Sequence, residues 1–172
     1  MPSVAVTVVG HDRPGIVHRV TSAIADLSGN LEDSSMSLLR GHFAMTLVAA
    51  LPNGVPVSQL RHRLTDLADD GLVVSVFEVT DEQTPDVGLA AVVSVHGADR
   101  PGIVRAATAV IMDHGGNITD LSTRLGRDLY VLTADVSFPS DTELAVVAAD
   151  LDRRMATMGV TASLHAVDED LL

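Results

Sequence analysis

The chain has 172 residues, 47% of them hydrophobic, and a formal net charge of −12. A field of this sign repels phosphate backbones and anionic lipid surfaces, so we expect no direct binding to nucleic acid or to membranes. Cysteine is absent, which excludes disulfides, thiolate metal sites and a cysteine nucleophile, and neither a signal-peptide pattern nor a membrane-length apolar run is present, so we expect a cytoplasmic protein.

The first half of the chain reads as alternating strands and helices. Residues 3–9 are β-branched and apolar, which predicts a buried strand. Asp12 and Pro14 predict a helix start, with Asp12 as the candidate N-cap, and Gly29 is predicted to end that helix as its C′ residue. The further predicted elements are strands over 31–39 and 43–51 around a turn at Arg40-Gly41, a helix over 56–70 and a strand over 72–79.

The second half repeats this pattern, because the chain contains an internal duplication. Residues 10–17 (GHDRPGIV) recur 87 positions later as residues 97–104 (GADRPGIV), and beyond Pro52 the offset becomes 88, so that Gly71 corresponds to Gly159. The predicted elements of this half are strands over 89–96, 117–125, 129–138 and 160–166 and helices over 103–114 and 142–158.

The order β-α-β-β-α-β, found twice, predicts an α+β protein of two tandem ferredoxin-like domains with antiparallel sheets. We place the domains at residues 1–80 and 88–167, with a polar linker over 81–87 and an acidic tail over 168–172. A unit of about 80 residues buries only about 60% of its unfolded surface. We therefore expect the two sheets to pair side by side, within one chain or in a homodimer, with the repeated turns near that interface.

The repeated Asp-Arg-Pro-Gly turn has two readings. Amide groups at a helix N-terminus attract anions, Gly15 lets a carboxylate approach the backbone, and the Asp12 side chain can accept an ammonium group, so one turn complements both ends of an amino acid. The alternative is a capped helix with no ligand, in which Arg13 and Arg100 are solvated or structural. Repetition of the turn favours ligand binding more than a single copy would, although geometry is duplicated as well.

The turn, together with the Gly-Asn pair that follows the predicted helix, resembles the ACT domain. The stretch GHDRPGIV followed by GNLEDS is similar to the tandem-ACT glycine cleavage system transcriptional repressor family. This resemblance covers nearly the whole chain. The resemblance implies small-effector binding at domain interfaces, and it implies that Asn30 and Asn117 contact the amino acid. The candidate ligand residues are Asp12, Arg13, Pro14, Gly15, Ile16, Asn30, Leu31, Asp99, Arg100, Pro101, Gly102, Ile103, Asn117 and Ile118.

We therefore expect a non-catalytic regulatory protein that binds a small amino acid, glycine or serine by resemblance, and controls a regulatory protein partner. The resemblance implies that this partner is a transcriptional regulator of glycine cleavage. The alternatives are an adaptor that pairs through its sheets without a metabolite, and a free-standing regulatory subunit of an amino-acid enzyme. No nucleophile motif or acid–base pair supports an enzyme, and no cofactor is expected. The seven histidines form no metal-binding pair on a predicted helix, so we expect no metal site.

Overall fold

The computed structural model describes residues 2–79, 88–126 and 129–167. The chain forms two compact units, Met1–Gln83 and Thr84–Leu172. The predicted linker over 81–87 and the predicted acidic tail lie outside the described residues. The elements of the first unit are β1 (Ser3–His11), α1 (Ile16–Ala25), β2 (Asn30–Leu39), β3 (His42–Ala50), α2 (Val57–Arg63), α3 (Thr65–Asp69) and β4 (Val73–Val79). Those of the second are β5 (Leu89–Gly97), α4 (Ile103–Asp113), β6 (Asn117–Leu125), β7 (Tyr130–Phe138), α5 (Leu144–Ala156) and β8 (Val160–Ala166).

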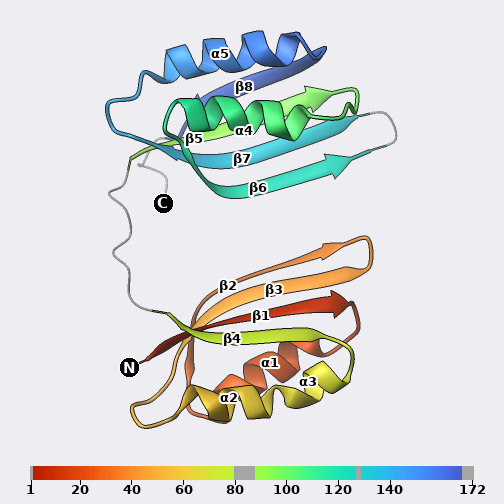
Figure 1. Ribbon diagram of the computed structural model, residues 1–172, viewed down its shortest axis with the longest axis vertical. Coiled ribbons are helices and arrows are strands. Elements are labelled where there is room, and N and C mark those ends of the chain that lie inside the picture. Colours follow the sequence, from red (N-terminus) through yellow and green to blue (C-terminus); the bar gives the residue numbers. More distant parts are fainter. Residues whose placement is uncertain (1, 80–87, 127–128, 168–172) are drawn as a thin grey trace. The chain divides into compact units, whose positions relative to one another are not determined.

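Each unit is a four-stranded antiparallel sheet with its helices on one face (Figure 1). The strand order is β2-β3-β1-β4 in the first unit and β6-β7-β5-β8 in the second, so the first strand of each unit lies at the centre of its sheet. The predicted α+β, ferredoxin-like plan is confirmed in both units. Among the described residues, no helix is long and apolar enough to cross a membrane, and α5, the longest, has 13 residues.

The core of each unit lies between the sheet and its helices. Alternate residues of β1 point into it, and Val4, Val6 and Val8 are fully buried against apolar side chains of α1 and α2. The opposite face of the first sheet carries no helix, and Val9, Val73 and Phe77 on it are 47%, 70% and 46% exposed. Period-two alternation in the central strand therefore separates a packed face from an open one.

The C-terminal end of α1 differs from the prediction that Gly29 is its C′ residue. Ser28 takes the left-handed conformation there, with φ of 57°, and its amide donates to the Ala25 carbonyl at 2.8 Å, while the Gly29 amide donates to the Ile24 carbonyl at 3.0 Å. This is a Schellman ending, with Gly29 one place later than expected. Close packing favours glycine at position 29, because an added Cβ would lie 3.0–3.1 Å from Ile24, the Ala50 carbonyl and Leu51.

The predicted single helix over 56–70 is also wrong, because Leu64 divides it into α2 and α3. Leu60, Leu64 and Leu67 are all buried, so the interruption keeps the apolar side of both pieces on the sheet. The second unit has one residue more between Pro139 and Gly159 than the first has between Pro52 and Gly71, and its helix α5 is continuous.

The predicted hairpin turn at Arg40-Gly41 is confirmed. Both residues have positive φ, 51° and 82°, which is the geometry of a two-residue type I′ turn. The turn joins β2 to β3 with Leu39 opposite His42. Near its start β2 has a bulge at Glu32, and β6 repeats the bulge at Thr119.

Candidate functional site

The turn between β1 and α1 contains the first group of predicted ligand residues. Asp12, Arg13, Pro14 and Gly15 are all exposed, whereas Ile16, the first helical residue, is buried in the core. The Asp12 amide donates to the Gly41 carbonyl at 3.0 Å, which ties the turn to the neighbouring hairpin. The structure therefore presents the Asp-Arg-Pro-Gly backbone at the end of the sheet where β1 ends.

The prediction that Asp12 caps this helix is wrong, because α1 begins at Ile16 with Gly15 at the N-cap position. Gly15 has φ of 92°, and Gly102 repeats this before α4 with φ of 94°. A Cβ on Gly15 would meet no described atom within 4 Å. The glycine is therefore required by backbone conformation in this structure, whether or not a ligand approaches it.

Both helix starts share an electrostatic property that follows from this geometry. No side chain among the described residues caps either α1 or α4 by a hydrogen bond. The first amides of each helix lack partners within the helix, and they carry the positive end of its dipole. Two equivalent positions in the chain can thus accept an anion at an exposed helix start.

Arg13 contacts Asp70, the residue that follows α3. Its guanidinium donates to the main-chain carbonyl of Asp70 and lies 4.0 Å from the Asp70 carboxylate. Arg19, one turn into α1, donates to the same carboxylate. The Arg19 hydrogen bond, with the charges of both arginines, holds the pKa of Asp70 below the ordinary range of an aspartate, against a smaller opposing effect of burial.

The structure does not bring Asn30 and Leu31 to the turn of their own unit. Asn30 is opposite Ala50 on β3, and Ala50 is opposite Ser3, the first residue of β1. The turn instead follows His11, the last residue of β1, which is roughly 27 Å away along the strand. One small amino acid cannot contact both places within a unit.

The second unit repeats this separation. Asn117 is opposite Ser137 and Ile118 opposite Val136, at the end of the sheet where β5 begins. The turn from Asp99 to Ile103 follows the other end of β5, with Asp99 to Gly102 exposed and Ile103 buried. Each unit therefore presents its predicted ligand residues in two separate groups, one at each end of its sheet.

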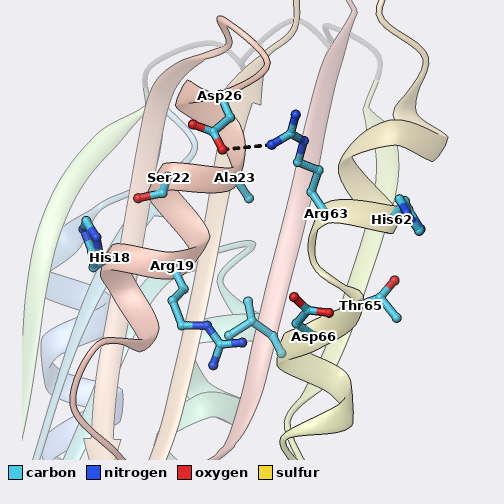
Figure 2. A pocket seen from close by; sticks show the side chains of 10 residues that line it. His18, Arg19, Ser22, Ala23, Asp26, His62, Arg63, Thr65 and Asp66 are labelled. Carbon is cyan, nitrogen blue, oxygen red and sulfur yellow. Dashed lines mark hydrogen bonds and ion pairs between the residues drawn. The ribbon is translucent and has the colours of Figure 1, made fainter.

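Sequence reasoning did not predict a groove between α1 and the α2–α3 segment, which none of the candidate ligand residues line. Figure 2 shows its two walls, with Asp26 and Arg63 joined across it at 2.9 Å. The volume is about 610 Å³. The signal in the sequence was a polar stripe at four-residue spacing along α1 and its C-cap, formed by His18, Ser22 and Asp26, which is typical of an exposed helix face.

The second unit has the corresponding groove between α4 and α5, with a volume of about 350 Å³. His114 Nε2 and Asp150 Oδ2 lie 2.9 Å apart across it, and Arg153 pairs with the same carboxylate. Both grooves are therefore crossed by polar pairs that join the two helical segments of a unit, which gives these residues a structural role.

Two imidazole rings also lie together beside the first turn. His11 and His42 are opposite each other on β1 and β3, with ring centroids 4.9 Å apart. Among the described residues, no group of three or more potential metal ligands is present. Two exposed imidazoles alone do not complete the four-ligand set typical of structural zinc.

Comparison with known proteins places relatives in both halves of the chain. A family model described as the ACT domain matches residues 3–76 and again residues 90–165. A UPF0237 protein of Methanopyrus kandleri is 39% identical over 71 residues, which are 41% of this chain and 79% of that protein. The glycine cleavage system transcriptional repressor of Escherichia coli K12 is 29% identical over 120 residues, which are 69% of this chain and 63% of the repressor, less than two thirds of its length. A solved structure of an unknown protein from Galdieria sulphuraria is 32% identical, with a TM-score of 0.83 over 97% of this chain and 99% of the other.

Proposed function

The chain belongs to the ACT domain family, with one such domain in each half, and from this premise we propose that it is a non-catalytic regulatory protein that binds a small amino acid and controls a protein partner. The resemblance stated from the repeated motifs is confirmed by the family match and by the repressor relative. Ligand and partner are our proposal.

The observation that carries the proposal is the pair of exposed, uncapped helix starts at equivalent places in the two domains. Each offers free backbone amides to a carboxylate. Each also has an aspartate three residues before its N-cap glycine, Asp12 or Asp99, which is exposed and can accept an α-ammonium group. An amino acid zwitterion is the small ligand that uses both charges, and glycine and serine are our first candidates.

Asn30 and Asn117 enter this proposal only through a second domain. Because each asparagine lies at the opposite end of the sheet from its own turn, its amide reaches a ligand on a turn only when another domain supplies it. We therefore place the complete site between two domains, of one chain or of a homodimer, with the turn from one and the strand start from the other. Occupancy then changes how strongly the domains associate, which is a means of shifting a population.

A protein partner fits this chain better than a nucleic acid. The net charge of −12 opposes approach to a phosphate backbone. The Escherichia coli relative is named a transcriptional repressor, and we extend to this chain the control of a regulatory protein through direct contact.

A second candidate function is an adaptor that pairs through its sheets and binds no metabolite. The observation in its favour is the helix-free face of the first sheet, on which Val73 and Phe77 are 70% and 46% exposed. Apolar side chains on an uncovered sheet face favour association with another surface.

A thermal-shift screen of the purified protein against the twenty amino acids, followed by calorimetric titration, tests the proposal. A ligand this small has few atoms, so we expect a dissociation constant in the micromolar to millimolar range. Asn30→Ala and Asn117→Ala should each weaken binding about 10- to 150-fold at a working site, the value of one hydrogen bond to a charged group.

Asn53→Ala is the matched control, because Asn53 is an exposed asparagine in the β3–α2 loop. All three variants should keep the melting temperature of the ligand-free parent. If no amino acid binds the parent, the amino acid proposal is wrong and the adaptor is favoured. If a ligand binds and both strand-start variants bind it normally, the two-domain site is wrong.

A further inference from the structure

The helix-free faces of the two sheets differ in chemistry, although the two domains share one fold. Residues opposite each other on neighbouring strands lie on the same face of a sheet, so the strand register assigns each residue to the helix side or to the open side. Four apolar side chains lie on the open side of the first sheet, and none of them is buried: Val9 on β1, Val48 on β3, and Val73 and Phe77 on β4.

The second sheet has polar side chains at the four matching places. In the same order these are His96, Asp135, Thr161 and His165, and all four are exposed. Asp120 lies directly opposite Asp135 on the neighbouring strand. Like charges placed opposite each other repel, and water weakens that repulsion. The open face of the second sheet is therefore suited to contact with water.

The fold itself does not impose this difference. Both sheets have the same strand order, and their outer strands β2 and β6 have a bulge in the same place. The second domain shows that this fold forms with a polar open face, which is the usual arrangement for an antiparallel sheet with one side in water. The apolar face of the first domain therefore indicates a surface that covers it.

The open face of the first sheet also carries little charge, in a chain whose net charge is −12. Among the described strand residues that the register assigns to this face, Asp33 is the one carboxylate; it lies on the outer strand β2, with Glu32 in the bulge beside it. The same set of residues contains no lysine or arginine. A strongly charged partner would find no complement on such a face, whereas an identical face meets little repulsion.

We infer that this face is a homodimer interface, which packs against the same face of a second copy of the chain. Besides its low charge, its area is enough for a dimer. The nine residues of β1 span about 30 Å and the four strands span about 19 Å, so each copy contributes about 600 Å². The total of about 1,200 Å² lies at the lower limit of specific interfaces, so we expect a reversible dimer with a dissociation constant in the micromolar range.

Phe77 is the expected anchor of this interface. It is the largest of the apolar side chains on the face, and about half of it is exposed. Ala5, its neighbour on the central strand β1, is buried, and Ala44 on β3 is also small, so the middle of the face is lower than the edge that carries Phe77. In a two-fold pair each Phe77 lies over the middle of the partner's face, as interdigitating side chains do between the sheets of a sandwich.

The second sheet is the less suitable occupant of this face. Asp120 and Asp135 would lose their hydration against Val73 and Phe77 without gaining a cation. The inference goes beyond the amino acid proposal, because the dimer needs no effector, and it gives the pairing in the adaptor candidate a defined surface and a defined partner.

Sedimentation equilibrium of the full chain tests the inference. We expect a monomer–dimer equilibrium that strengthens as sodium chloride is added, because salt screens the repulsion between two chains of charge −12. The double substitution Val73→Thr and Phe77→His gives the first sheet the residues of the second. Each side chain is lost twice in a two-fold interface, so the dissociation constant should rise about 100-fold or more. His165→Ala, at the matching place of the second sheet, is the control and should dimerise like the parent.

Cross-linking locates the contact, and it stays informative if the double variant is unstable. Because the chain has no cysteine, Thr46→Cys places a single thiol on the exposed open side of β3, opposite Thr7 on β1. A bismaleimide reagent of about 10 Å, the separation of packed sheets, should join two such chains. Thr133→Cys, at the matching place opposite Ser94 in the second sheet, should give no cross-linked dimer.

A parent that stays monomeric at its highest soluble concentration would overturn the inference, and the occupant of the face would then be the second domain or another protein. A dimer that weakens with added salt, a dimer that the double substitution leaves intact, or equal cross-linking from both cysteines would overturn it as well, because the contact would then lie elsewhere. Failure of the proposed function has a different signature: calorimetry then finds no amino acid bound, while the parent still dimerises.

Discussion

Replacing Gly15 by alanine should destabilise the first domain although the new methyl group touches nothing. Gly15 has φ of 92°, a region that L-residues with a Cβ rarely adopt, and the space around its Cβ position is open in the structure. The left-handed conformation costs an L-residue roughly 1–2 kcal/mol. Because no clash adds to this, we expect Gly15→Ala to lower the free energy of unfolding by about that amount.

Urea unfolding of the full chain, followed by circular dichroism and by amide exchange in α1 and α4, measures the effect domain by domain. Gly15→Asn should lose less, since asparagine tolerates positive φ better than alanine does. Gly102→Ala should cause a similar loss in the second domain. Gly102 has φ of 94°, and the nearest described atom to its added Cβ would be a Met158 methyl carbon at 3.8 Å.

Gly116→Ala provides a contrast with a different cause. Its Cβ would lie 2.6 Å from Phe138 and 2.7 Å from Ile111, both buried, so overpacking should cost about 1–3 kcal/mol. If Gly15→Ala is as stable as the parent, the backbone explanation of the repeated glycine is wrong, and its reason must be sought in a ligand.

Three further predictions follow from charge and packing. The Arg19 hydrogen bond lowers the pKa of Asp70, so its ionised form stabilises the fold above the pKa of the unfolded carboxyl, and this stabilisation is lost as the pH falls through the lower folded pKa. The difference in urea midpoint between the parent and Asp70→Asn should therefore hold near neutral pH and disappear in acid, below the folded pKa. Phe138 is 1% exposed, so Phe138→Ala should lower the free energy of unfolding by about 3–5 kcal/mol in the same assay, and a loss below about 1 kcal/mol would contradict its place in the core. The purified protein should not shift duplex DNA in a gel near physiological salt because of its charge of −12, and tight, salt-sensitive binding would refute this.

The fold could be predicted from the sequence because the two halves repeat each other, so each predicted strand or helix of one half could be compared with its counterpart in the other. Alternating β-branched residues predicted the central strands, and the spacing of buried leucines predicted which helix faces pack. The errors lie at the boundaries of α1 and at Leu64, which divides the predicted helix over 56–70 into two. Asp12 has the side chain of an N-cap residue, but the helix begins later, after Gly15 with its positive φ. The sequence alone does not distinguish a glycine that is required by its φ angle from one, such as Gly29, that is required because a Cβ would be too close to its neighbours.

The candidate site was only partly predictable. The Asp-Arg-Pro-Gly turns and both asparagines are exposed, as a motif would suggest, whereas Ile16 and Ile103 are buried. The distance between turn and asparagine depends on which end of the sheet each occupies. Asn30 and Gly15 are close in sequence, but α1 lies between them and takes the chain from one end of β1 to the other. The pairing of Arg13 with Asp70 joins residues 57 apart, with no local pattern to indicate it.

The central position of the first strand has a consequence for synthesis on the ribosome. β1 emerges first, but its partners are β3 at residues 42–50 and β4 at residues 73–79. At about 5–20 residues per second, this apolar strand waits for seconds before both edges are paired. β5, the matching strand of the repeat, begins at Leu89, after β4 has been made. Synthesis from the N-terminus thus makes all four strands of the first sheet before β5, whose sequence is similar to that of β1 and could compete for the same partners. Refolding from denaturant does not provide this order, because all strands are present from the start.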